Sequence, residues 1–132
     1  MDYVKQLYDL ARQCRNNAYA PYSEFKVGAA VRCGQNIYGG CNVENISYPC
    51  GTCAEAGAIE AMIAGGDCKI NEILIVAATD NIMPCGNCMQ KIAEFGDNET
   101  VIHSADLSGN IRSYRLDELL PHKFKAKEIK HA

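Results

Sequence analysis

Long apolar segments are missing from this 132-residue sequence, and their absence excludes the simplest membrane proteins. The longest clearly apolar stretch, Ile73 to Ala78, is far shorter than the roughly 20 residues that a transmembrane helix needs. The first residues mix charged and apolar side chains, so they do not resemble a secretion signal. We therefore expect a cytoplasmic protein with no membrane contact.

An excess of positive charge is also missing. The chain has 13 lysines and arginines against 16 aspartates and glutamates, which gives a net charge of −3 and a pI near 5.6. Such a surface has no overall attraction for phosphate backbones, so we expect no nucleic-acid partner and favour a small polar ligand. The 48% apolar and 22% charged residues are typical of a folded globular protein.

Cysteine, by contrast, is abundant, with eight residues. In a cytoplasmic chain, paired cysteines bind a metal or perform redox chemistry more often than they form disulfides. Two Cys-x-x-Cys pairs occur, one at Cys50 and Cys53 and the other at Cys85 and Cys88. The remaining four are expected to be small buried apolar side chains: Cys14, Cys33, Cys41 and Cys68.

Apolar periodicity predicts an alternation of helices and strands without repeat or linker, so residues 1–132 are expected to form a single domain. This order of elements predicts the α/β class, as a three-layer α/β/α sandwich whose helices cover both faces of a five-stranded mixed sheet. Helices are predicted over residues 4–18, 53–64, 86–95 and 117–120, and strands over residues 27–33, 37–42, 72–78, 100–104 and 111–115.

The two cysteine pairs allow two kinds of zinc site. Cys53 is predicted to begin one helix, and Cys85 and Cys88 to begin the next, where the positive helix end stabilises thiolates. Nothing in the context of Cys50 requires it to point the same way. Four thiolates would form a closed structural site, whereas three leave one tetrahedral position open for a water, as catalytic zinc requires. A thiol redox protein is a third hypothesis, but it explains neither the second pair nor Glu55.

Glu55 follows Cys53 by two residues on the same helical turn, where a carboxylate can exchange protons with water at a metal without binding the metal itself. Cys53-Ala54-Glu55 and Pro84-Cys85-Gly86-Asn87-Cys88 match the motif of zinc deaminases. With these motifs and four further segments, the chain resembles the small homotetrameric, zinc-dependent cytidine deaminases of the cytidine/deoxycytidylate deaminase superfamily. The further segments are residues 20–25, 27–30, 40–45 and 118–121.

This resemblance implies one Zn²⁺ per subunit, held by Cys53, Cys85 and Cys88, with Glu55 as the catalytic proton shuttle. The implied reaction is hydrolytic deamination of cytidine and deoxycytidine to uridine and deoxyuridine, with release of ammonia, in pyrimidine salvage. The implied enzyme is a hydrolase that acts on the C–N bond of a cyclic amidine.

The resemblance also implies the substrate contacts. Asn42 and Glu44 are expected to hold the ribose hydroxyls, Phe25 to line the nucleoside pocket, and the backbone amide of Ala54 to bind the base. Tyr48 and Phe124 are expected to reach a neighbouring subunit's site, which makes the tetramer necessary. From the residues alone, Phe25 and Phe124 could instead be core aromatics, and Asn42 and Glu44 a solvated strand end.

The chain departs from this family pattern beside its metal motif. Relatives usually continue Cys-Ala-Glu with Arg-Thr, and here Ala56-Gly57 follows, while Met83 replaces a usual serine. Three thiolates around Zn²⁺ leave a net negative centre, which raises the pKa of a water there. Helix N-termini, Lys91 or a backbone amide could offset this charge in place of the arginine. The changes also keep open a substrate of the blasticidin S type or a modified cytosine nucleoside.

Overall fold

The computed structural model describes residues 2–126 and residue 129. Its strands are β1 (Val27–Cys33), β2 (Asn36–Cys41), β3 (Glu72–Ala77), β4 (Val101–Ala105) and β5 (Ile111–Arg115). They form one sheet in the order β2-β1-β3-β4-β5. Strands β3 and β4 run parallel and the other neighbours antiparallel, so the predicted five-stranded mixed sheet is confirmed.

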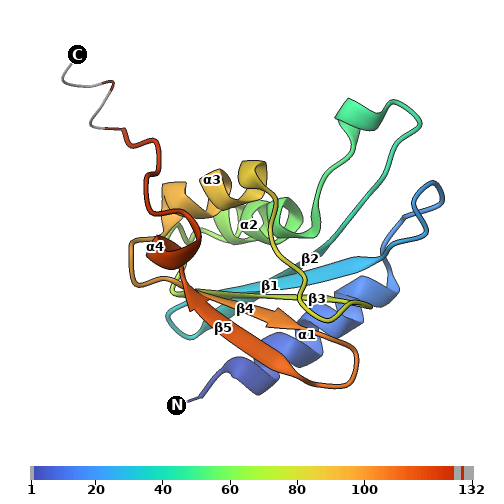
Figure 1. Cartoon of the computed structure of the whole chain (residues 1–132), viewed down its shortest axis with the longest axis horizontal. Helices are drawn as coiled ribbons and strands as arrows, with labels where there is room; N and C mark the ends of the chain where they lie inside the picture. The colour runs from blue at the N-terminus through green and yellow to red at the C-terminus, as the bar shows by residue number, and fades with distance from the viewer. Residues whose placement is uncertain (1, 127–128, 130–132) are drawn as a thin grey trace.

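Helices cover both faces of this sheet (Figure 1). Helix α1 (Val4–Asn16) packs on one face, and α2 (Ala54–Ala64) and α3 (Gly86–Phe95) lie on the other. A short α4 (Leu116–Leu119) follows β5. The three-layer α/β/α sandwich is therefore confirmed, while the single-domain assignment of residues 1–132 stays a prediction. Among the described residues, no helix is long and apolar enough to cross a membrane.

Two apolar clusters fill the spaces between the layers. Ile73 and Ile75 of β3 point toward α2 and α3, whereas Leu74 and Val76 point toward α1. All four side chains are completely buried, which explains why the sequence of β3 is continuously apolar rather than alternating. The strand thus forms the centre of both halves of the core.

Helix α2 lies unusually close to β2. A Cβ atom at Gly40 would lie only 2.3 Å from the backbone nitrogen of Ala58 and 2.7 Å from the carbonyl oxygen of Ala54. Only glycine permits such an approach, so the backbones of the strand and the helix are in direct contact here. This contact fixes the start of α2 relative to the end of β2.

The α1 face also buries a polar cluster at one end of the sheet. The Glu72 carboxylate accepts from Arg32 Nε at 2.6 Å and lies 2.7 Å from His103 Nε2. The other ring nitrogen of His103 lies 2.7 Å from Ser113 Oγ. Both ring nitrogens of His103 therefore have partners on this face, away from the two cysteine pairs.

Besides shifts of one residue at the ends of several helices and strands, three details differ from the sequence predictions. Helix α1 ends at Asn16 rather than Ala18, and a 3₁₀ turn, η1 (Tyr48–Cys50), was not predicted. The expectation that the four unpaired cysteines are buried is wrong for Cys68, which is exposed in the loop after α2. Cys14, Cys33 and Cys41 are half-buried. Cys68 lies in the loop between α2 and β3, where its side chain reaches solvent in spite of the usual apolar preference of a cysteine.

Candidate active site

Three cysteines meet where α2 and α3 begin. Cys53 is the N-cap residue of α2, Cys85 is the N-cap residue of α3, and Cys88 lies in the first turn of α3. Their sulfur atoms all lie within 4.8 Å of one another. Two helix N-termini therefore converge on one group of thiols, as the two sequence motifs predicted.

The electrostatics of this group favour a bound cation. Burial and the neighbouring thiols raise the pKa of Cys88, and burial raises the pKa of Cys53. The backbone amides of Cys88 and Asn87 instead lower the pKa of Cys85. Three thiolates this close repel one another unless a cation lies between them, and Zn²⁺ binds thiolate sulfurs at about 2.3 Å. The donor set therefore fits zinc.

Cys50 lies outside this group. It ends the η1 turn, is exposed, and its sulfur lies 3.6 Å from Ser47 Oγ. Among the described residues, the candidate metal group contains only three cysteines, so it leaves a tetrahedral position open. This geometry does not favour the closed four-cysteine module.

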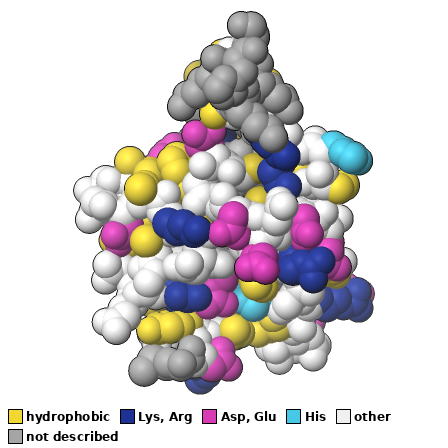
Figure 2. Space-filling view, turned by 90° about the vertical axis from the view of Figure 1, so that its left-hand side faces the viewer, with side chains coloured by type: hydrophobic (Ala, Val, Ile, Leu, Met, Phe, Trp, Pro, Cys, Tyr) yellow, Lys and Arg dark blue, Asp and Glu magenta, His cyan; other side chains and the backbone are white. Residues whose placement is uncertain are grey.

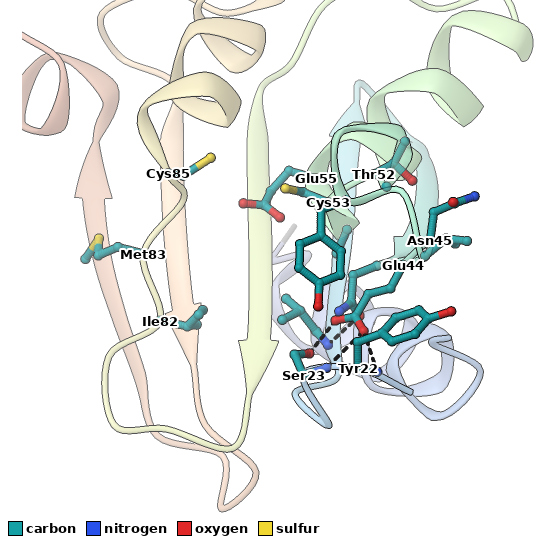
Figure 3. A pocket seen from close by; sticks show the side chains of 16 residues that line it. Tyr22, Ser23, Glu44, Asn45, Thr52, Cys53, Glu55, Ile82, Met83 and Cys85 are labelled. Carbon is teal, nitrogen blue, oxygen red and sulfur yellow. Dashed lines mark hydrogen bonds between the residues drawn. The ribbon is translucent and has the colours of Figure 1, made fainter. Parts of the chain in front are cut away.

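Glu55 extends from the first turn of α2 beside the thiols (Figure 3). Its side chain is 6% exposed although it is a carboxylate. Burial raises the pKa of Glu55, while its own backbone amide, the Cys88 thiol and the positive charge of Lys91, in that order, lower it. A buried carboxylate with a raised pKa at the edge of a metal group is suited to accept and return a proton.

A cavity of about 560 Å³ opens beside Glu55, which is within the size range of small-molecule sites. Cys53, Ala54 and Glu55 line it beside the metal group, and Asn42 and Glu44 line it beside residues 22–27. Ala54 is fully buried as the first residue of α2, so its backbone amide belongs to a helix N-terminus. The cavity thus joins the metal group to the segment after β2.

Asn42 and Glu44 both make ordered contacts rather than forming a solvated strand end. Asn42 donates through Nδ2 to the carbonyl oxygen of Phe25 at 2.9 Å and accepts from Val27 N at 2.9 Å. The Glu44 carboxylate accepts from the backbone nitrogens of Tyr22 and Ser23 at 3.0 and 3.1 Å. Both side chains are therefore held by hydrogen bonds to residues 22–27.

The predicted aromatic residues lie at the surface, not in the core. Tyr48 lines the cavity in η1 although it is 74% exposed, and its ring lies 6.1 Å from the ring of Tyr22. Phe25 is 38% exposed and Phe124 is 59% exposed, and neither is among the residues that line the cavity. The alternative that Phe25 and Phe124 are core aromatics is therefore wrong.

Sequence reasoning gave no role to several residues that line the cavity. Ser23 donates its hydroxyl proton to Glu44, and Ile82 lies beside Met83 on the wall opposite (Figure 3). Ser23 stood in one of the matched segments, but its partner lies 21 positions away and no local signal links the two. The loop that carries Ile82 follows β3 without any periodic pattern.

The position after Glu55 shows what stands in place of the usual arginine. Ala56 is 2% exposed and has no polar side chain to donate to a sulfur. Backbone amides at the start of α3 act on Cys85, and the charge of Lys91 acts on Glu55. The backbone amides thus act on a sulfur of the metal group, whereas the charge of Lys91 acts on the carboxylate and not on a sulfur.

Comparison with known proteins identifies the family. Residues 1–104 match the family model described as the cytidine and deoxycytidylate deaminase zinc-binding region. The chain is 35% identical over 131 residues to cytidine deaminase of Sporosarcina psychrophila, covering 98% of this chain and 96% of the relative. It is 38% identical over 119 residues to cytidine deaminase of Mycobacterium tuberculosis, covering 86% and 84%.

Solved structures show the same relationship in three dimensions. The crystal structure of cytidine deaminase from Burkholderia pseudomallei superimposes with a TM-score of 0.87 at 37% identity, covering 94% of this chain and all of that one. The family model covers most of the chain, and the first relative and this solved structure cover nearly all of it. These similarities agree with the geometry of the three cysteines and Glu55. The chain belongs to the cytidine and deoxycytidylate deaminase family.

Proposed function

We infer that this protein is a zinc-dependent cytidine deaminase, which hydrolyses cytidine and deoxycytidine to uridine and deoxyuridine and releases ammonia. The observation that carries this conclusion is the group of Cys53, Cys85 and Cys88 beside the buried carboxylate of Glu55, at one end of a nucleoside-sized cavity. Its relatives over nearly the whole chain are cytidine deaminases.

The reaction needs water and a proton carrier. A C–O bond forms at C4 of the cytosine ring, and the C–N bond to the exocyclic nitrogen breaks, so water and cytidine yield uridine and ammonia. Cys53, Cys85 and Cys88 would hold Zn²⁺, which, when bound, acts as a Lewis acid and makes hydroxide available near neutral pH. The three cysteines also leave room for the reacting water, because they occupy only three tetrahedral positions.

Glu55 would move the protons in this reaction. It takes the proton from the attacking water, delivers it to N3 of the ring, and later assists the departing ammonia. Its burial supports this role, because a raised pKa lets this carboxylate accept a proton more readily than an ordinary carboxylate does, and still return it in a later step. The backbone amide of Ala54 would bind the base, which places C4 beside Glu55.

The far end of the cavity would bind the sugar through Asn42 and Glu44. The acidic side chains of Glu44 and Glu55 line the cavity, and no lysine or arginine is among the described residues of its lining. A phosphate on the sugar would meet this negative charge without a cation to offset it. We therefore assign the protein a nucleoside substrate rather than a nucleotide.

The proposal extends to a homotetramer in the cytoplasm, with sites completed by neighbouring subunits. Tyr48 and Phe124 would enter a neighbouring site, and Phe25 would contact the nucleoside once the mouth of the cavity is covered. Large apolar side chains lie exposed near that mouth, as expected for an interface: Tyr19, Tyr22, Val43, Ile46 and Tyr48.

Ammonia release tests the function directly. The purified protein, with its zinc content measured, is incubated separately with cytidine, deoxycytidine, deoxycytidylate and blasticidin S. We expect ammonia from the two nucleosides and little from the nucleotide. A protein with one zinc per chain that releases no ammonia from either nucleoside would overturn the proposal, and release from blasticidin S alone would reassign the substrate. Sedimentation velocity tests the tetramer.

A further inference from the structure

The carboxylate of Glu44 is held by a short turn that has no assigned part in the reaction. Glu44 follows the end of β2, and its backbone nitrogen donates to the carbonyl oxygen of Tyr19 at 2.8 Å. Neighbouring Val43 exchanges two backbone hydrogen bonds with Thr52, at 3.0 and 2.9 Å. The main chain of Glu44 is therefore fixed from both sides, which leaves the carboxylate orientation to be set by side-chain contacts.

Three donors from the turn at residues 21–23 supply those contacts. One carboxylate oxygen of Glu44 accepts from the backbone nitrogens of Tyr22 and Ser23, and the other accepts the hydroxyl proton of Ser23. These bonds also lower the pKa of Glu44, with the Ser23 hydroxyl as the largest cause. Figure 3 shows the three bonds converging on the carboxylate at the cavity wall.

The direction of the Ser23 hydroxyl is determined by its other partner. Ser23 Oγ accepts from the backbone nitrogen of Phe25 at 3.1 Å. A hydroxyl that accepts there keeps its proton for donation, and an ionised carboxylate can only accept. The chain of bonds therefore runs from Phe25 N–H through Ser23 to Glu44.

The backbone of the turn is strained, which indicates that surrounding contacts determine its conformation. Glu24, between Ser23 and Phe25, has a φ of 57°, in the left-handed region that side-chain-bearing residues rarely adopt. Such a conformation persists only where the surroundings determine it, and it occurs most often at functional sites. Here Asn42 holds the following residues through the carbonyl oxygen of Phe25 and the nitrogen of Val27.

The Glu44 carboxylate has few acceptor positions left for a ligand. A carboxylate offers about four lone-pair positions, two on each oxygen. The turn takes both positions on one oxygen of Glu44 and one on the other. One position is left, on the oxygen that Ser23 also holds, so Glu44 can accept from a single further donor.

We propose that Ser23 is a positioning residue, which orients the Glu44 carboxylate so that its one remaining acceptor position meets a secondary hydroxyl of the nucleoside sugar. Ser23 acts through Glu44 and does not touch the reacting atoms. This inference rests on the proposed function, since it assumes a nucleoside with its sugar at Glu44. Its consequence is that removal of the Ser23 hydroxyl weakens binding only of ligands that carry those sugar hydroxyls.

Inhibition by product analogues tests this consequence. Uridine and 2′,3′-dideoxyuridine are compared as competitive inhibitors of cytidine deamination by the zinc-loaded wild type and by Ser23→Ala. We expect the inhibition constant of uridine to rise about tenfold and that of the dideoxy compound to change less than about twofold. Ser23→Thr, which keeps the hydroxyl, should stay close to wild type. Ser108→Ala, in the turn between β4 and β5, is the matched serine control.

A double variant separates positioning from general structural damage. In a Glu44→Gln background, Ser23→Ala should have little further effect on uridine, because the two residues act as one unit. If Ser23→Ala does not fold, Ser23→Cys gives the same comparison, since a thiol of similar size is a weak donor. Equal weakening of both inhibitors, or no weakening of either, overturns the positioning role. A wild type that deaminates no nucleoside overturns the proposed function instead.

Discussion

The cavity contains two carboxylates whose surroundings shift their pKa values in opposite directions. Glu55 is 6% exposed at the metal end, and burial raises its pKa. Glu44 lies at the other end, and hydrogen bonds, the one from the Ser23 hydroxyl above all, lower its pKa. Two carboxylates kept apart in this way can serve different tasks, one exchanging protons and the other staying ionised to accept hydrogen bonds. These opposite shifts support the proposed roles, with Glu55 in the chemistry and Glu44 in recognition.

The largest expected effect comes from removing one of the three cysteines that would hold zinc. Cys85→Ser removes a ligand whose pKa the start of α3 lowers, so zinc should be lost together with turnover. We expect metal affinity to fall by more than about 100-fold, since even outer-shell changes cause losses up to that size. Zinc titration with a chromogenic chelator measures it.

Cys50→Ser is the matched control for this change. Cys50 belongs to the other Cys-x-x-Cys pair but lies outside the group of three, so its replacement should leave zinc and ammonia release unchanged. Equal loss of zinc in both variants would mean a closed site with four cysteines. It would also remove the open position on which the role of Glu55 depends.

The second effect comes from removing the proton exchange of Glu55 while the metal stays in place. Glu55→Gln has nearly the same shape but cannot exchange protons, so kcat should fall by about 10²- to 10⁴-fold. Zinc content, measured on the same sample, should remain at one per chain. An unchanged kcat at full zinc occupancy would assign the proton transfer to another group.

The third effect concerns the sugar end. Glu44→Gln keeps two acceptor positions on one atom but loses the charge, so KM for cytidine should rise about tenfold with kcat nearly unchanged. Steady-state kinetics on cytidine separates the two constants. A fall in kcat as large as that of Glu55→Gln would erase the distinction between the two carboxylates.

The smallest expected effect is on the protonation of Glu44, whose pKa is compared with that of Glu55. A carbon-13 NMR titration, assigned with Glu44→Gln, should place the pKa of the Glu44 carboxyl below its ordinary value of 4.5. Because the folded-state pKa is the lower one, Glu44 stabilises the fold fully above 4.5 and loses that contribution as the pH falls through the folded value. Ser23→Ala should move the titration upward, and an unmoved titration would contradict the assigned cause.

Local patterns predicted the metal end almost completely. The spacing of Cys53 and Glu55, and the Pro84-Cys85 pair before a helical stretch, place thiols and carboxylate at helix starts, where the geometry follows from the helix itself. The layers of helices on both faces of a mixed sheet also followed from periodicity, because β3 is apolar on both faces, whereas the order of the strands in the sheet was not predicted. These features depend on residues that lie close together in the sequence.

The sugar end could not be predicted in the same way. The bonds of Glu44 to Tyr22 and Ser23 join segments about 20 residues apart through a turn with a left-handed residue, and no short pattern records such a meeting. Cys68 and the η1 turn show the same limit, because loop packing sets their exposure and shape. Sequence therefore identified Glu44 by resemblance but not the residues that hold it.

The backbone contact between Gly40 and α2 fixes the position of β2 relative to this helix. The same strand that rests against the helix carrying Cys53 and Glu55 leads within four residues to Asn42 and Glu44. The separation between the metal group and the pair Asn42 and Glu44 is thus set by two backbones in contact, with no side chain between them.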